Sequence, residues 1–288
     1  MNSLDVSGRS AVVTGAGRGL GRAFAQALAS AGASVALLAR SAAELRETAD
    51  VIGANVRVFP VDVTDAPAVR DVFARIGDVD ILVNNAGVLG PIRPFWQMDV
   101  DEWWGVMDVN VRAALLCMHA VLGGMVHRRR GRVINISTGM FPAAYLSPYM
   151  ASKTALVRAT ECLANETRDL GVALFSLAPG SVRTRMTSHS LMSDEGREWI
   201  PWYGRIFDEG LDVPAERAAA RVVELASGRY DALSGLYLTP FDDLEGMLAQ
   251  IDGIRARRLY SLRVQAIGPG SPALAAIRDA AESPKRED

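Results

Sequence analysis

This 288-residue chain contains only two cysteines and three histidines, and its net charge is close to zero. The two cysteines, Cys117 and Cys162, lie far apart in apolar, helix-patterned stretches, so we expect buried thiols rather than a disulfide framework. The three histidines have no spacing typical of zinc ligands, and no metal site is expected. A formal net charge of -2 gives no indication of binding to nucleic acid or to an anionic membrane surface.

Long apolar runs are absent as well. Residues 1–10 contain neither a basic segment nor a continuous apolar segment, so no secretory signal is expected. No stretch approaches the roughly 18 uninterrupted apolar residues that would indicate a membrane-spanning helix. We therefore expect a cytoplasmic protein that does not cross a membrane.

Short apolar runs alternate with longer amphipathic segments from the start of the chain, which is typical of βαβ units on a parallel sheet. Strands are predicted over 11–14, 34–39, 56–60, 81–83, 132–137, 172–177 and 236–238. Helices are predicted over 20–31, 42–52, 66–75, 101–127, 148–170 and 214–227. The predicted fold class is α/β: a single Rossmann-type, doubly wound domain over 1–243, with a seven-stranded, mostly parallel sheet flanked by helices.

Two segments depart from this alternation. Residues 187–211 crowd Trp199, Trp202 and Tyr203 between a strand and the next helix. Because ligands of open α/β sheets bind beyond the carboxyl ends of the strands, we expect this segment to be a substrate lid. Residues 244–288 are expected to form a C-terminal helical extension that ends in a flexible tail.

The octet TGAGRGLG follows the first predicted strand and opens the first predicted helix. Glycines in this position permit a tight turn and a close approach of the backbone, while the helix N-terminus offers unpaired N–H groups to a pyrophosphate. An ordinary strand-to-helix turn is the alternative. The motif therefore predicts dinucleotide binding by Thr14, Gly15, Gly17, Arg18, Gly19, Leu20 and Gly21.

The end of the second strand distinguishes the two nicotinamide dinucleotides. A carboxylate there would accept from a ribose hydroxyl and repel a 2′-phosphate, but the strand ends in Ala39, followed by Arg40 and Ser41. A guanidinium and a hydroxyl suit a 2′-phosphate, and Arg18 could close on it from the other side. NADP(H) is therefore predicted over NAD(H), which stays possible if Arg40 is only a solvated loop residue.

Five further motifs resemble those of the short-chain dehydrogenase/reductase family, in that family's order. They are DV at 62–63, NNAG at 84–87, Asn110 within DVNVRA, YMASK at 149–153 and PGSVRT at 179–184, and the resemblance extends over roughly residues 5–239. It implies a homodimer or homotetramer that packs through 101–127 and 148–170. It also implies cofactor contacts from Asp62, Val63, Asn85, Ala86, Gly87, Lys153, Pro179, Gly180, Val182 and Thr184.

Tyr149 and Lys153 lie four residues apart on a predicted helix, so their side chains share one face. Such a pair is often only a solvated face, but the surrounding motifs favour a catalytic pair. A free tyrosine has a pKa of about 10, and a nearby ammonium and an oxidised nicotinamide would lower this pKa toward the working pH. The resemblance assigns Asn110 to a proton relay that links Lys153 to solvent through a water molecule, whereas a capping or loop asparagine is the alternative.

A hydroxyl donor is expected just after the fifth strand, in RVINISTG. Alignment on the asparagine–isoleucine–serine step favours Thr138, although Ser137 restores more of the family's usual spacing to Tyr149. Either hydroxyl could stabilise a developing alkoxide. The residues expected to border the substrate are Trp96 in the loop after NNAG, Met140, and Trp199 and Trp202 in the lid.

Together these residues predict an NADP(H)-dependent oxidoreductase that interconverts a ketone and a secondary alcohol of moderate size and apolar character, with Tyr149 as the acid/base. Within the enzyme class, the alternatives are an NAD-linked dehydrogenase and a related enzyme with an unusual isomerase or dehydratase step. An alternative from another class is a non-catalytic, cofactor-binding regulatory protein. Loss of Tyr149 or Lys153 would be the expected mark of that class, and both are present.

Overall fold

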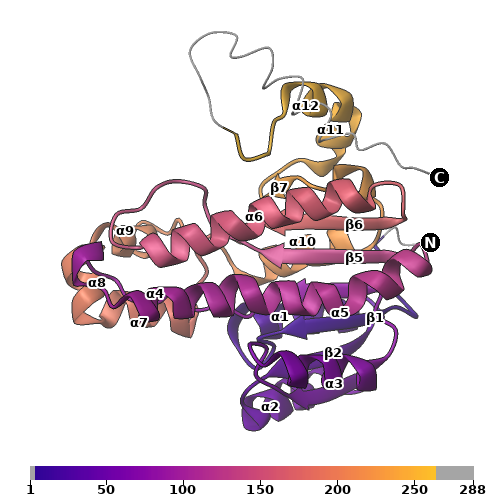
Figure 1. Cartoon of the computed structure of the whole chain (residues 1–288), viewed down its shortest axis with the longest axis horizontal. Helices are drawn as coiled ribbons and strands as arrows, with labels where there is room; N and C mark the ends of the chain where they lie inside the picture. Colours follow the sequence, from indigo (N-terminus) through magenta and orange to yellow (C-terminus); the bar gives the residue numbers. More distant parts are fainter. Residues whose placement is uncertain (1–3, 264–288) are drawn as a thin grey trace.

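The computed structural model describes residues 4–263. These residues form three layers, in which helices cover both faces of one seven-stranded sheet (Figure 1). The strands lie in the order β3-β2-β1-β4-β5-β6-β7, and neighbouring strands are parallel throughout. The Rossmann-type α/β fold predicted from the alternating segments is confirmed.

The strands lie where the apolar runs predicted them, within one residue at either end. They are β1 (Ser10–Thr14), β2 (Ser34–Ala39), β3 (Val56–Pro60), β4 (Ile81–Asn84), β5 (Gly131–Ile136), β6 (Val172–Leu177) and β7 (Tyr237–Leu238). Strands covered on both faces are buried along nearly their whole length, as in β6, where every residue is buried. The continuous apolar runs follow from this double cover.

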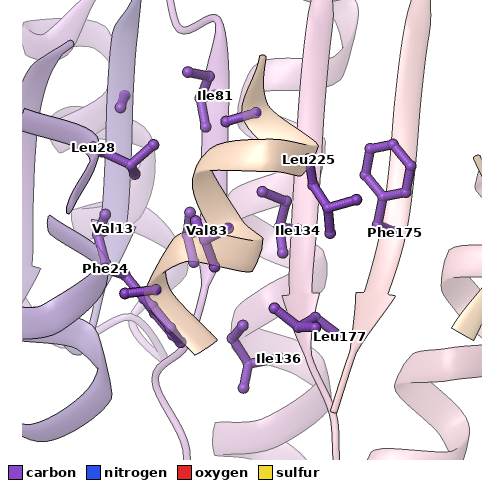
Figure 2. Packing of buried hydrophobic residues seen from close by; sticks show 14 of the residues in the cluster. Val13, Phe24, Leu28, Ile81, Val83, Ile134, Ile136, Phe175, Leu177 and Leu225 are labelled. Carbon is purple, nitrogen blue, oxygen red and sulfur yellow. The ribbon is translucent and has the colours of Figure 1, made fainter. Parts of the chain in front are cut away.

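Two hydrophobic cores lie on the two faces of the sheet. One face carries α1 (Gly19–Ser30), α2 (Ala42–Ile52) and α10 (Ala215–Ala226), and the other carries α3 (Ala66–Ile76), α5 (Ala113–His127) and α6 (Ser147–Thr167). Since successive side chains of a strand point to opposite faces, Val13 packs in the first core and Val12 in the second. Figure 2 shows the first core, with Phe24, Leu28 and Leu225 facing the side chains of the central strands.

The helix over 101–127 is interrupted. It consists of α4 (Val100–Met107), the π-helical turn η2 (Asp108–Arg112) and α5. This 28-residue run, Val100–His127, is long and apolar enough to cross a membrane by length and composition, since an 18-residue window within it has a mean hydropathy of 1.5. The criterion of an uninterrupted apolar stretch missed it. The run packs against α3, α6, β4 and β5, so the core accounts for much of its apolar character.

The segment predicted to be a lid is helical. It contains α7 (Arg185–Met192), α8 (Asp194–Trp199) and α9 (Trp202–Asp208), which gather beyond the carboxyl ends of β5 and β6 (Figure 1). The predicted C-terminal extension contains α11 (Leu244–Ala249) and α12 (Ile251–Arg257), while residues 264–288, including the predicted tail, lie outside the described residues. Of the two thiols expected to be buried, Cys117 is buried, but Cys162 is exposed on α6.

Candidate active site

The glycine turn connects β1 to α1 at the carboxyl edge of the sheet. Gly15 has a φ of +65°, and a Cβ on Gly21 would lie 2.2 Å from the Gly15 carbonyl oxygen. Both positions therefore need glycine. The turn leaves the N-terminal N–H groups of α1 facing outward from the sheet edge, which fits the pyrophosphate of a dinucleotide.

The loop after β4 holds this turn in place. The Thr14 hydroxyl accepts hydrogen bonds from the backbone amides of Asn85 and Ala86, each at 3.0 Å. The Asn85 side-chain amide donates to the Thr14 carbonyl at 2.9 Å. The Asn85 side chain thus holds the glycine turn through its hydrogen bonds. Asn85 has this structural role in addition to its expected contact with the cofactor.

The end of β2 carries the groups predicted to select a 2′-phosphate. Arg40 is exposed, and within residues 4–263 no carboxylate oxygen lies within 4.0 Å of its guanidinium. The Ser41 hydroxyl caps α2 by accepting from the Glu44 amide at 3.2 Å, which leaves its own proton available. Arg18, by contrast, is paired with Glu44 at 2.9 Å. Of the two predicted arginines, only Arg40 is unengaged.

Asp62 and Val63 follow β3 near Arg40. Hydrogen bonds from Thr64 lower the pKa of Asp62, and the Arg40 charge lowers it further. Asp62 is therefore a carboxylate at neutral pH, available as an acceptor for an adenine amine. Val63 is buried beside it.

Tyr149 and Lys153 lie in the first two turns of α6, as the four-residue spacing predicted. Lys153 is 4% exposed, and its Nζ lies 5.9 Å from the centre of the Tyr149 ring. The Lys153 Nζ donates to the Ile136 carbonyl at 2.8 Å, at the end of β5. The Lys153 ammonium is thus held by the end of β5 and lies over the Tyr149 ring.

In the chain alone, without a nicotinamide, the pKa of Tyr149 lies above its ordinary value. Burial raises it to about 12, although a hydrogen bond with Thr138 opposes the increase. Burial also lowers the pKa of Lys153 to about 8. Desolvation therefore dominates at both groups in the chain alone, and Tyr149 keeps its proton at neutral pH.

Two residues were predicted as alternative hydroxyl donors after β5, and both line the cavity. The Thr138 side chain lies close enough to the Tyr149 phenol to lower its pKa as a hydrogen-bond partner. The Ser137 hydroxyl is 3% exposed and has no hydrogen-bond partner within the described part of the chain, although Ser137 also lines the cavity. Thr138 therefore occupies the position next to the phenol.

Asn110 lies in η2 and bridges the loop after β4 to α6. Its Oδ1 accepts from the Val88 amide at 2.8 Å, and its Nδ2 donates to the Val88 carbonyl and to the Ser152 hydroxyl, both at 2.9 Å. A Cβ on Gly87 would lie 3.1 Å from Asn110 Oδ1 and 3.5 Å from Lys153 Nζ. Gly87 thus leaves a narrow space between Asn110 and Lys153.

A cavity of about 390 Å³ opens over these groups. Of the predicted cofactor residues, its lining includes Leu20, Asn85, Gly87, Lys153, Pro179, Gly180, Val182 and Thr184. The lid contributes Thr187, Ser190, Ile200, Trp202, Tyr203 and Ile206. The nicotinamide end of the predicted cofactor site, the tyrosine and the lid therefore share one space.

Only one of the four predicted substrate residues lines this cavity, namely Trp202. Trp96 lies in η1 (Phe95–Gln97) with 81% of its surface exposed. Trp199 packs on Tyr145, with ring centres 4.9 Å apart, and Met140 points toward Thr154 and a neighbouring pocket. Their positions in the sequence were near the site, but their side chains turn away from it.

Two tyrosines in the cavity were not predicted. Tyr203 of α9 is hydrogen-bonded to the Ser181 side chain, and the Tyr237 hydroxyl of β7 donates to the Thr138 carbonyl at 3.0 Å. Neither belongs to a motif. Their presence in the cavity depends on how α9 and β7 pack against the rest of the fold, which the spacing of residues in the sequence does not show.

A parallel sheet with a glycine turn at one helix N-terminus and a tyrosine–lysine pair over the same edge is typical of Rossmann-type, dinucleotide-dependent oxidoreductases. Comparison with protein families agrees. The short chain dehydrogenase family model matches residues 9–194, and the chain belongs to this family.

The chain is 41% identical over 192 residues to a short chain dehydrogenase of Pseudocercospora fijiensis, covering 63% of this chain and 62% of that relative. It is 34% identical over 200 residues to the 3-oxoacyl-acyl-carrier-protein reductase FabG of Vibrio cholerae, covering 67% and 81%. It is 37% identical over 193 residues to the inactive hydroxysteroid dehydrogenase-like protein 1 of Homo sapiens, covering 64% and 58%. The chain thus spans less than two thirds of the length of two of these relatives.

A solved structure is similar over nearly the whole described chain. It is a candidate NAD(P)-dependent gluconate 5-dehydrogenase of Beutenbergia cavernae with NADP bound at low occupancy. It superposes with a TM-score of 0.75 at 32% identity, covering 86% of this chain and 100% of its own.

Proposed function

We propose that this protein is an NADP(H)-dependent oxidoreductase that interconverts a ketone and a secondary alcohol. The observation that carries the proposal is that Tyr149 and Thr138 line the same cavity, shared with the glycine-turn side of the sheet, where the Thr138 side chain acts on the pKa of the phenol as a hydrogen-bond partner. A carbonyl oxygen has two lone pairs, so both hydroxyls can donate to it.

The chemistry follows from the states of these groups. When bound, the nicotinamide would supply a hydride to the carbonyl carbon or accept one from the alcohol. Tyr149 donates its proton to the substrate oxygen as negative charge develops there, and Thr138 donates a hydrogen bond to the same atom. Lys153, 5.9 Å from the Tyr149 ring centre, stabilises the phenolate left behind.

The preference for NADP(H) is supported by the end of β2. Arg40 and Ser41 present a free guanidinium and a hydroxyl proton there, and Ala39 carries no carboxylate that would repel a 2′-phosphate. The similar Beutenbergia cavernae structure has NADP bound. Arg18 does not add to this support, since Glu44 holds it.

An apolar substrate is supported by the lining of the cavity. Among the described residues that line it, Lys153 alone carries a formal charge at neutral pH, and its ammonium is engaged by Ile136. Large apolar side chains, Leu89, Phe141, Leu146, Met150, Ile200, Trp202 and Ile206, form much of the wall. A carboxylate such as that of gluconate would find no other cation here, so a neutral ketone is the better fit.

Purified protein with NADPH and a panel of aryl and alkyl ketones tests this proposal. We expect NADPH oxidation that depends on the ketone, a lower KM for NADPH than for NADH, and loss of turnover in Tyr149→Phe with NADPH binding retained. A protein that binds NADPH, turns over no ketone or alcohol, and behaves the same with Tyr149→Phe would refute it.

A second candidate, a non-catalytic cofactor-binding protein, is favoured by the human relative described as inactive. This chain keeps Tyr149 in the lining of the cavity beside Lys153, and a binding role alone does not require the tyrosine. NADPH binding without turnover of any ketone or alcohol would favour this candidate.

A further inference from the structure

Tyr237 connects the last strand to the residue that faces the catalytic tyrosine. Its hydroxyl donates to the backbone carbonyl of Thr138 at 3.0 Å, between residues 99 positions apart in the chain. Tyr237 lines the cavity, but its hydrogen bond goes to the backbone of Thr138 rather than into the open space. The contact therefore acts on the placement of Thr138.

Thr138 lies where the sheet no longer holds the chain. Ser137 still pairs with β6, its amide donating to the Leu177 carbonyl at 2.8 Å, although β5 itself ends at Ile136. The segment 139–146 that follows contains no helix or strand, and Tyr145 within it has a φ of +66°. A donor from outside this segment is thus the means of fixing the Thr138 peptide group.

Tyr237 is itself held from both sides. On one side β7 pairs with β6, where Ser176 lies opposite Tyr237. On the other side the Tyr237 amide donates to the Tyr260 carbonyl at 2.8 Å, in the C-terminal extension. The extension is fastened to α6 in turn, because the Leu262 amide donates to the Glu161 carboxylate at 2.7 Å.

The phenol of Tyr237 is also a permanent donor. Burial, with a smaller contribution from the Asp242 charge, raises the pKa of Tyr237 to about 12. Its hydroxyl therefore keeps its proton over the whole range in which the protein would work. A donor of fixed position and fixed protonation is suited to holding a neighbouring group.

We propose that Tyr237 is a positioning residue, which orients the Thr138 peptide so that the Thr138 hydroxyl meets Tyr149. This inference rests on the proposed reductase function. It gives the C-terminal extension a part in the site, since the extension supports the strand that carries Tyr237.

The test compares Tyr237→Phe with Tyr230→Phe, in the full chain. Tyr230 is a matched control because its hydroxyl also makes one hydrogen bond, to Glu245 at 2.7 Å, but faces away from the cavity. We expect Tyr237→Phe to lower kcat for ketone reduction roughly 2- to 12-fold, the value of one ordinary hydrogen bond, with NADPH affinity unchanged. Tyr230→Phe should leave kcat unchanged, whatever it does to Tm.

A double-mutant cycle with Thr138→Ala separates positioning from a direct effect. If Tyr237 acts through Thr138, Tyr237→Phe should cause no further loss of kcat in the Thr138→Ala background. Effects that multiply would overturn the proposal, because they would show that Tyr237 acts independently of Thr138.

Hydrogen–deuterium exchange gives a readout that needs no turnover. With NADP⁺ present, amides within 138–146 should exchange faster in Tyr237→Phe than in the wild type or Tyr230→Phe. Equal exchange in all three proteins would overturn the positioning role even if kcat fell. If the wild type reduces no ketone, the proposed reductase function fails, and the exchange comparison still decides whether Tyr237 holds the segment.

Discussion

The Lys153 ammonium donates to the Ile136 carbonyl at 2.8 Å, so α6 is joined to the end of β5 by a buried charge. A buried ammonium is disfavoured by its loss of solvation, and the pKa of Lys153 falls to about 8. The pKa of Tyr149 rises to about 12. Between pH 6 and 10, Lys153 is therefore the member of the pair that changes charge.

This charge change predicts the pH dependence of the reaction. We expect kcat/KM for ketone reduction to be level below pH 8 and to fall above it by up to about tenfold per pH unit, because neutral Lys153 no longer stabilises the phenolate. Initial rates from pH 6 to 10 with NADPH check this. A level profile through pH 10 would contradict it.

Destabilisation of the fold by the titration of Lys153 does not explain the decline of kcat/KM above pH 8. The folded pKa of Lys153 lies below its unfolded value, so the unfolded chain binds more protons between about pH 8 and 10.5. The contribution of Lys153 to the free energy of unfolding therefore increases with pH in that range. Thermal unfolding measured at each pH provides the control.

Thr138 and Ser137 predict different losses of activity. Thr138→Ala removes the hydroxyl bonded to Tyr149 and should lower kcat by about 100-fold or more, as removal of an oxyanion donor does in other enzymes. Thr138→Ser keeps the hydroxyl and should retain most of the rate. Ser137→Ala serves as the neighbouring control, and its kcat should change by only a few fold. Steady-state kinetics of the three variants check this. If Ser137→Ala were the inactive variant, Ser137 rather than Thr138 would be the hydroxyl donor.

Arg40 should determine the choice of cofactor. Arg40→Ala removes the free guanidinium at the end of β2 and should raise the KM for NADPH about 10- to 100-fold, the value of a charge-assisted hydrogen bond, with little effect on the KM for NADH. Arg46→Ala is the matched control, since Arg46 is an exposed arginine on α2. An unchanged KM for NADPH in Arg40→Ala would remove the basis for the predicted cofactor preference.

The parts of the site that the sequence predicted correctly are those set by local spacing. The glycine turn, and the four-residue step from Tyr149 to Lys153, need only a neighbouring strand or helix to take their positions. Other features depend on packing between distant segments. They are the contact of Tyr237 with Thr138 and the directions in which Trp96 and Trp199 point. The raised pKa of Tyr149 in the chain alone has the same origin, because burial is a property of the whole fold, and the lowering expected when an oxidised nicotinamide is bound stays a prediction.

The lid supplies the last prediction, which concerns the apolar wall of the cavity. Trp202 lines the cavity and packs edge-to-face with Phe141 at 6.4 Å, so Trp202→Ala removes apolar surface from both the cavity and the closed lid. We expect the KM for a bulky aryl ketone to rise about 3- to 30-fold, somewhat less than for a fully buried side chain because Trp202 is 40% exposed. Trp96→Ala is the control, since Trp96 lies outside the cavity lining and is 81% exposed. Steady-state kinetics with aryl and small alkyl ketones distinguish the cases: a rise confined to the aryl ketones and to Trp202→Ala locates the substrate under α9, whereas equal effects of the two tryptophans would place it elsewhere.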